Sequence, residues 1–248
     1  MSRTERRPVE DFEAVFQAIA HQAPGSVILV GGHAVNVWAL TYVDRIGDQL
    51  RPHRPLTSAD MDLVATRNAL IALHKELGGT LHLSQSREIT HGTLVLGVEP
   101  DTREIDVLRS LNGVPRIETQ DTVTLAVCGH PVPVLFPHLL LQGKLKNARH
   151  LDQGGRQDDK HVKIMLLVLR EFLTDVVSSA SPENERPALA LLQHALGVVI
   201  SEDAHEFVRR HKDVLPTDAL PVKLIVSSPL KKLSAFGQQE LPRILASS

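Results

Sequence analysis

The chain has 248 residues and a mass of 27.3 kDa, enough for one large domain or two smaller ones. A formal charge of −2 argues against a globally basic nucleic-acid binder, and a single cysteine argues against a disulfide or thiolate-zinc scaffold. The longest aliphatic run, Ile164–Leu169, has only six residues, which argues against a membrane-spanning protein. Six Phe, one Trp and one Tyr are too few for a platform on which nucleic-acid bases stack. The N-terminus has no apolar stretch of the signal-peptide type, so we expect a cytoplasmic protein.

The first half of the chain alternates between helical and strand-like patterns. Apolar residues near helical spacing predict a helix over 9–21, which Pro24-Gly25 ends. The short apolar run over 26–30 predicts a buried strand that stops at two glycines, and a helix is expected over His33–Tyr42. Residues 44–57 are polar, and we expect a surface loop there. The next elements are predicted as strands over 61–66, 80–83, 93–98 and 104–108, with a helix over 68–77.

The second half is mostly helical by pattern. After a predicted hairpin over 122–135, helices are expected over 137–150, 158–175, 188–200 and 202–212, with an exposed linker over 178–187 and a poorly defined tail from about residue 217. We therefore predict an α+β fold in which a mixed sheet is flanked by helices. The expected division is an α/β domain over 1–135 and a helical domain over 136–248.

Three carboxylates lie on two of the predicted strands. Asp60 and Asp62 are two residues apart at a strand start, so both side chains leave the same face. Asp106 lies between apolar residues of another short strand, where burial of a carboxylate is costly unless a cation receives it. Carboxylates converging from two neighbouring strands repel one another, and one or two Mg²⁺ ions would relieve that repulsion. The spacing therefore predicts a magnesium site.

The glycine pair Gly31-Gly32 follows the first predicted strand and precedes a helix. Such a junction allows a phosphate to approach the backbone, while the free N–H groups and dipole of the helix start face the anion. A lone Gly-Gly or a lone D-x-D is usually a turn feature. The combination of both with Asp106 favours a site that binds a metal and a triphosphate.

The motifs VILVGGHAV, ADMDLV and EIDVL together resemble the polymerase-β-type nucleotidyltransferase superfamily over about residues 25–165. Within it, LVGGHAVNVWA and DMDLVAT look most like the minimal nucleotidyltransferases of the AbiEii toxin type. The resemblance implies a nucleotidyltransferase-like fold and an enzyme with two Mg²⁺ ions. Such an enzyme transfers a nucleoside monophosphate from an NTP to a hydroxyl of an RNA (tRNA-like) or protein acceptor. It further implies a cognate antitoxin as a partner.

Carried over to these positions, the resemblance assigns phosphate contacts to Gly31 and Gly32. It makes Asp60, Asp62 and Asp106 the metal ligands, and Asp106 would also help to deprotonate the acceptor hydroxyl. The family's triphosphate-binding lysine matches Lys144 in GKLKNAR, where the alternative is a solvated helix lysine. Lys146 and Arg149 are weaker candidates.

The sequence departs from the AbiEii-type pattern at several positions. Ser58 stands where Thr is usual, and Arg54 lies two residues too early. Asp158 fits the later motif, but His161 stands where a second Asp is expected. Two alternatives therefore stay open: an antibiotic-type nucleotidyltransferase that acts on small molecules, and a non-catalytic nucleotide-binding or toxin-partner module.

Basic residues gather in three clusters that are either solvated faces or nucleic-acid contacts: Arg3/Arg6/Arg7, Arg45/Arg51/Arg54 and Lys144/Lys146/Arg149. The second cluster lies in the expected loop before the metal strand, where it could hold an RNA backbone. His33, directly after the glycines, is either a phosphate contact or a helix-start residue. Cys128 lies in a hairpin turn with no sign of activation.

Overall fold

The computed structural model describes residues 5–85, 88–114 and 116–247 and divides the chain into two compact units. One unit is Met1–Thr41 with Leu50–Gly143, and the other is Tyr42–Gln49 with Lys144–Ser248. The second change of unit falls inside helix α5 (Pro137–His150). Compactness does not show which parts fold independently, so the domain boundary near residue 135 stays a prediction.

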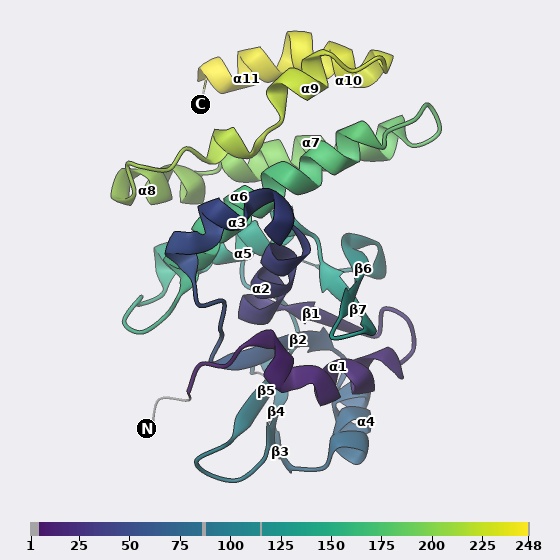
Figure 1. The fold of residues 1–248 in the computed structure, drawn as a ribbon, viewed down its shortest axis with the longest axis vertical. Coiled ribbons are helices and arrows are strands. Elements are labelled where there is room, and N and C mark those ends of the chain that lie inside the picture. The colour runs from purple at the N-terminus through teal and green to yellow at the C-terminus, as the bar shows by residue number, and fades with distance from the viewer. Residues whose placement is uncertain (1–4, 86–87, 115, 248) are drawn as a thin grey trace. The chain divides into compact units, whose positions relative to one another are not determined.

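A seven-stranded mixed sheet forms the centre of the first unit (Figure 1). β2 pairs in parallel with β5 and antiparallel with β1, while β1 pairs in parallel with β7. The remaining pairs, β3–β4, β4–β5 and β6–β7, are antiparallel. In the sheet order the strands are β3 (Thr80–Leu83), β4 (Thr90–Leu96), β5 (Arg103–Leu108), β2 (Asp60–Ala65), β1 (Val27–Val30), β7 (His130–Leu135) and β6 (Thr122–Val127).

The two faces of β2, β5 and β4 differ in burial. Residues on one face are fully buried, among them Met61, Leu63 and Ile105, while the alternating residues on the other face are partly exposed. Helices α1 (Glu13–Ala20) and α4 (Arg67–Leu77) contact each other and pack on β7 and β4, with η1 (Val9–Phe12) leading into α1. This in/out alternation is typical of strands with a single core face.

Helix α2 (Gly31–Thr41) packs against β1 and β2, and the short strand β1 is buried along its whole length. The Trp38 indole N–H donates to the Leu135 carbonyl at 2.9 Å, which ties α2 to the end of β7. The helix begins at Gly31, two residues before the predicted start at His33. The glycine pair therefore belongs to the first turn of the helix.

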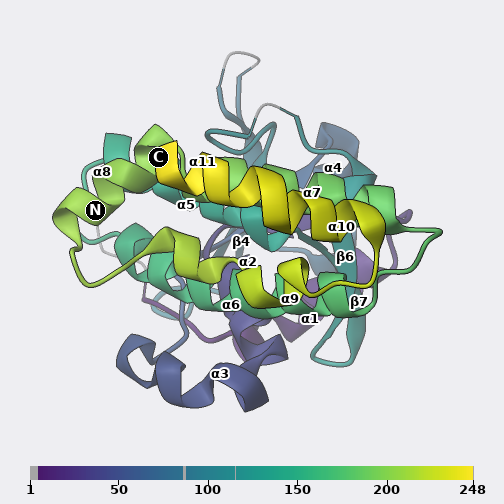
Figure 2. The ribbon, with the colours of Figure 1, turned by 90° about the horizontal axis from the view of Figure 1, so that it is seen from above.

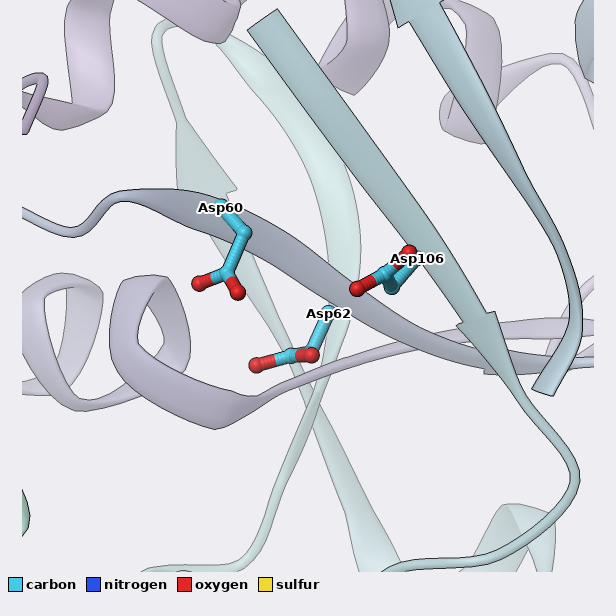
Figure 3. A group of neighbouring side chains, drawn as sticks. All are labelled: Asp60, Asp62 and Asp106. Carbon is cyan, nitrogen blue, oxygen red and sulfur yellow. The ribbon is translucent and has the colours of Figure 1, made fainter. Parts of the chain in front are cut away.

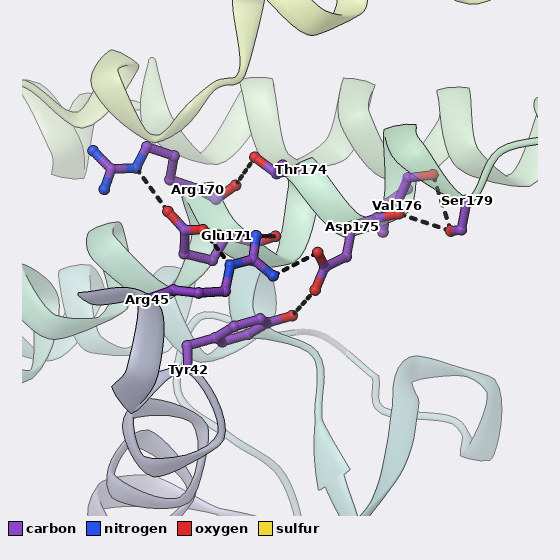
Figure 4. Close-up of polar contacts among 8 residues, drawn as sticks. All are labelled: Tyr42, Arg45, Arg170, Glu171, Thr174, Asp175, Val176 and Ser179. Carbon is purple, nitrogen blue, oxygen red and sulfur yellow. Dashed lines mark hydrogen bonds and ion pairs between the residues drawn. The ribbon is translucent and has the colours of Figure 1, made fainter. Parts of the chain in front are cut away.

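The expectation of a surface loop over 44–57 is wrong for its first part, which forms α3 (Val43–Leu50) and η2 (Arg51–His53). Ile46 and Leu50 are spaced by four residues and are buried, so a narrow apolar stripe stabilises a mostly polar helix. Tyr42 and Arg45 also bond to α6 (Asp158–Ser178). The Tyr42 hydroxyl donates to Asp175 at 2.9 Å, and the Arg45 guanidinium pairs with Glu171 and Asp175 (Figure 4).

In its described residues that follow α3, the second unit consists of helices and connecting loops, without a strand. After α6 it continues with α7 (Glu185–Val199), α8 (Glu202–Arg210), η4 (Pro216–Ala219), α9 (Val222–Val226), α10 (Lys231–Ala235), the π-helical turn η5 (Phe236–Glu240) and α11 (Leu241–Ser247). The described part of the tail from residue 217, expected to be poorly defined, is therefore mostly helical. Figure 2 shows α10 and α11 as one continuous run, and Leu233, Phe236 and Leu241 bury their side chains from it.

The predicted fold class is confirmed: a mixed sheet flanked by helices is followed by a mostly helical C-terminal part. Within the described ranges, no helix combines the length and the apolar character that a membrane crossing requires.

Candidate active site

The three predicted carboxylates meet on the partly exposed face of the sheet (Figure 3). Parallel pairing of β2 with β5 sets Asp62 directly opposite Asp106, and Asp60 leaves the same face two residues earlier. One carboxylate oxygen of each residue lies within 4.8 Å of those of the other two. Opposite ligands of one Mg²⁺ are about 4.2 Å apart. The spacing is therefore close to what one ion, or a closely spaced pair, requires.

The electrostatics of this cluster raise the pKa of Asp106. Burial is the main cause, and the charge of Asp60 adds to it, while a hydrogen bond from the Thr93 hydroxyl opposes the rise. A bound cation would favour the ionised carboxylate and so reverse this balance. Three anionic oxygen donors are the hard ligands that Mg²⁺ prefers, so the residues present fit that ion.

Thr93 belongs to this site and was missed by motif analysis. It lies on β4 directly opposite Asp106, and its hydroxyl donates to Asp106 Oδ1 at 2.5 Å. No motif contains Thr93, because its contact depends on how β4 and β5 pair. The signal that could have found it is the hairpin register between the two strands.

Gly31 makes room for the Asp62 carboxylate. Its φ of +66° lies in the left-handed region, which residues other than glycine rarely adopt. A Cβ at this position would lie 1.9 Å from Asp62 Oδ2 and 2.6 Å from Asp62 Cβ. Rotation of the aspartate cannot relieve the second contact. The structure thus gives Gly31 a steric role beside the carboxylates, and phosphate binding by Gly31 and Gly32 stays a prediction.

We expect Gly31→Ala to destabilise the protein by about 2–4 kcal/mol, because it adds backbone strain and an overpacked contact with Asp62. Urea denaturation measures this loss. Gly197→Ala, in helix α7, is the matched control, because a Cβ there meets nothing within 4 Å. That control should be neutral or stabilising by up to about 1 kcal/mol. Equal stability of Gly31→Ala and wild type would contradict the close packing of Gly31 against Asp62.

His33 lies in the core of the first unit and is fully buried. Its ring packs on Phe12 with a centroid distance of 4.6 Å, and neither ring nitrogen has a hydrogen-bond partner among the described residues. Burial lowers the pKa of His33 to about 4, so the ring is neutral at pH 7. Of the two interpretations of His33, the burial favours a packing residue of the helix start.

Buried His33 should make the protein less stable as the pH falls from about 6.5 to about 4. In this window the unfolded chain binds a proton at His33, while the folded chain does not. The loss over the window is about 3 kcal/mol. Urea denaturation at several pH values measures it, and His33→Leu should flatten the slope. The exposed His205 on α8 provides a control, since His205→Gln should leave the slope in place. An unchanged slope in His33→Leu would rule out His33 as its source.

Lys144 lies in the second unit on α5, where its ammonium group pairs with Asp158 at 3.0 Å. Both side chains are almost completely buried, and Arg156 also pairs with Asp158 at 2.6 Å. The solvated alternative for Lys144 is therefore wrong, while its contact with a triphosphate stays a prediction. Lys146 and Arg149, the weaker candidates, are also paired in the second unit.

Other predicted basic contacts are engaged within their own units. Lys146 pairs with Asp203, and Arg149 pairs with Glu202 and Asp203. Arg45 is bound to α6, so the RNA-binding interpretation of the second cluster loses one of its three members. In the first cluster Arg7 pairs with Asp11 and Asp101, and Arg3 lies outside the described residues.

Cys128 and His161 are two further residues that the sequence analysis considered. Burial and the charges of Glu10 and Glu13 raise the pKa of the Cys128 thiol, which disfavours the nucleophilic thiolate. His161, which stands in place of the expected second Asp, is buried on α6 one turn after Asp158.

Comparison with known proteins supports the fold. No protein-family model matches the chain, and no curated protein matches it at a significant level. Among solved structures, the chain resembles an antigenic nucleotidyltransferase-like protein from Paracoccidioides brasiliensis. The match has a TM-score of 0.50 and 17% identity, and it covers 87% of this chain and 94% of the other. At that identity the likeness establishes a nucleotidyltransferase-like fold and nothing finer.

Proposed function

We propose that this chain is a Mg²⁺-dependent nucleotidyltransferase that moves a nucleoside monophosphate from an NTP to a hydroxyl group and releases pyrophosphate. The observation that carries the proposal is the meeting of Asp60, Asp62 and Asp106 on one sheet face in a chain with a nucleotidyltransferase-like fold. The carboxylates are half-buried, so they are accessible to a hydrated ion and still partly shielded from water.

Asp60, Asp62 and Asp106 would hold the metal, which when bound neutralises triphosphate charge and orients the in-line attack. Gly31 and Gly32 form the first turn of α2, whose free backbone N–H groups attract anions. We propose that these N–H groups bind the phosphates of the NTP. Gly31 would in addition keep Asp62 in its ligating position, since a side chain there would displace it.

The proposed reaction is a single displacement at phosphorus. The acceptor hydroxyl oxygen forms a bond to the α-phosphorus, and the bond from that phosphorus to the bridging oxygen breaks as pyrophosphate leaves. The hydroxyl proton passes to Asp106 or to an adjacent water. General-base help of this kind is worth about 10²–10⁴-fold in rate. Lys144 is the proposed contact to the triphosphate, and Asp158, which pairs with its ammonium group, would hold that group in position.

We propose that the acceptor hydroxyl belongs to a tRNA-like RNA or to a protein, as in the AbiEii type. We also propose that a cognate antitoxin regulates the enzyme. The motifs LVGGHAVNVWA and DMDLVAT support that assignment. NTPs are plentiful in the cytoplasm, which we propose as the location. The buried His161 in place of a second Asp favours one alternative, a non-catalytic nucleotide-binding module of the same fold.

Incubation of the protein with each α-³²P-labelled NTP, Mg²⁺ and total cellular RNA or protein tests the proposal. Label in RNA or protein supports it and identifies both the donor and the acceptor class. Label only on an added aminoglycoside or other small hydroxyl compound would instead indicate the antibiotic-type alternative. Mg²⁺-dependent NTP binding without pyrophosphate release would favour the non-catalytic module.

A further inference from the structure

Asp106 has a different neighbour on each side in the sheet. In register with it stand Asp62 on β2 and Thr93 on β4, and all three side chains leave the same face. One flank of Asp106 therefore carries a repelling carboxylate and the other a hydrogen-bond donor. The row continues beyond Thr93 to His82 on the edge strand β3.

The hydroxyl of Thr93 donates to one defined oxygen of Asp106, Oδ1. Figure 3 shows one oxygen of Asp106 turned toward the carboxylates on β2 and the other turned away. A carboxylate in a strand can rotate about its last side-chain bond, and repulsion from two neighbouring carboxylates would drive such rotation. The short hydrogen bond from Thr93 opposes this rotation, because Thr93 is β-branched and has few rotamers of its own.

We propose that Thr93 is a positioning residue that holds Asp106 through Oδ1 and so presents its other oxygen to a cation shared with Asp60 and Asp62. This inference rests on the proposed function. Groups that orient metal ligands through a hydrogen bond typically contribute 10–100-fold to metal affinity or activity. In this role Thr93 would act through its hydrogen bond to Asp106, without touching the substrate or the metal itself.

A purely structural role for Thr93 makes a different prediction. Cross-strand pairs between half-buried residues stabilise a sheet regardless of any ligand. In that case the loss of the hydroxyl would lower the melting temperature and leave metal affinity unchanged. The two roles therefore separate in metal affinity measured apart from turnover.

The test measures Mn²⁺ binding, by water-proton relaxation, in full-length wild type and in Thr93→Val, which keeps the shape and removes the hydroxyl. We expect Thr93→Val to bind Mn²⁺ about 10-fold more weakly. Thr93→Ser, which restores the donor, should recover most of that affinity. Circular dichroism and thermal unfolding with EDTA would show that each variant folds.

Thr90→Val is the matched control on the same strand. The Thr90 hydroxyl bonds to that of Ser84 at 2.7 Å rather than to Asp106, so this variant also loses one hydroxyl bond of β4. It should keep wild-type Mn²⁺ affinity. Equal affinity of Thr93→Val and wild type overturns the positioning role while the metal site stands. Absence of Mn²⁺ binding by wild type would overturn the metal site of the proposed function and the role of Thr93 with it.

Discussion

Asp60→Asn should give a protein that is more stable than wild type without metal and that no longer transfers nucleotides. The charge of Asp60 opposes ionisation of Asp106, so the neutral amide removes a repulsion from the cluster. Two charges at 4.8 Å, the upper limit of the oxygen separations in this cluster, repel by about 3 kcal/mol at an effective dielectric constant of 20, and solvent screening reduces this. We expect a gain of about 1 kcal/mol, or about 2–4 °C in melting temperature.

The same substitution removes a ligand, so it should abolish the stabilisation by Mg²⁺. At 100 times its Kd, a bound ion stabilises the wild type by about 2.7 kcal/mol. Transfer should fall by at least about 10³-fold, because a metal supplies several kcal/mol of transition-state stabilisation. Thermal unfolding with EDTA and with Mg²⁺, beside the labelled-NTP assay, measures all three effects.

Glu104→Gln provides the matched control for Asp60→Asn. Glu104 lies on β5 directly opposite Asp60, so its neutralisation also removes a negative charge from this face of the sheet. Glu104 is outside the carboxylate group that could hold a metal. The variant should therefore gain metal-free stability and keep its response to Mg²⁺. An Asp60→Asn protein that still responds to Mg²⁺ and turns over like wild type would contradict the proposed metal site.

The carboxylate cluster was predictable because it depends on local rules. Alternation along a strand places Asp60 and Asp62 on one face whatever surrounds them. The apolar neighbours of Asp106 identify a strand that is buried on its other face. Only the parallel pairing of β2 with β5 needed the fold, and that pairing is what brings Asp106 opposite Asp62.

Features that depend on pairing across the fold could not be found in the same way. Thr93 meets Asp106 only in one register of the β4–β5 hairpin, and a shift of one residue would turn its hydroxyl to the other face. The helix α3 has a strongly polar composition. Its formation depends on packing of the buried Ile46 rather than on the helix propensity of its residues. Lys144 donates to Asp158, which lies fourteen residues later in the chain. The two are joined by a loop whose conformation sequence patterns do not predict.

Loss of Asp158 should produce the largest destabilisation in the second unit. Asp158 is 2% exposed and is the counterion of Lys144 and Arg156. Asp158→Ala leaves the buried Lys144 ammonium without its partner, which typically costs about 3–5 kcal/mol. Urea denaturation at pH 7 measures the loss. The double variant Asp158→Leu/Lys144→Met removes both charges and should recover most of the stability, because a buried pair is often replaceable by apolar residues. A double variant as unstable as Asp158→Ala would show that the unpaired lysine is not the cause.

The Lys144–Asp158 pair should also make stability depend on pH, in a lower pH range than the one in which His33 acts. Burial raises the pKa of Asp158, but the charge of Lys144 and the hydrogen bonds from Arg156 and Lys144 outweigh it, so the pKa lies below its ordinary value. The stability that the pair contributes is complete above about pH 5 and is lost as the pH falls through that lowered pKa. His33 acts earlier, between about pH 6.5 and 4. Stability should therefore fall in two steps, of which His33→Leu removes the upper one and the double variant the lower one. A single step that neither variant alters would refute both assignments.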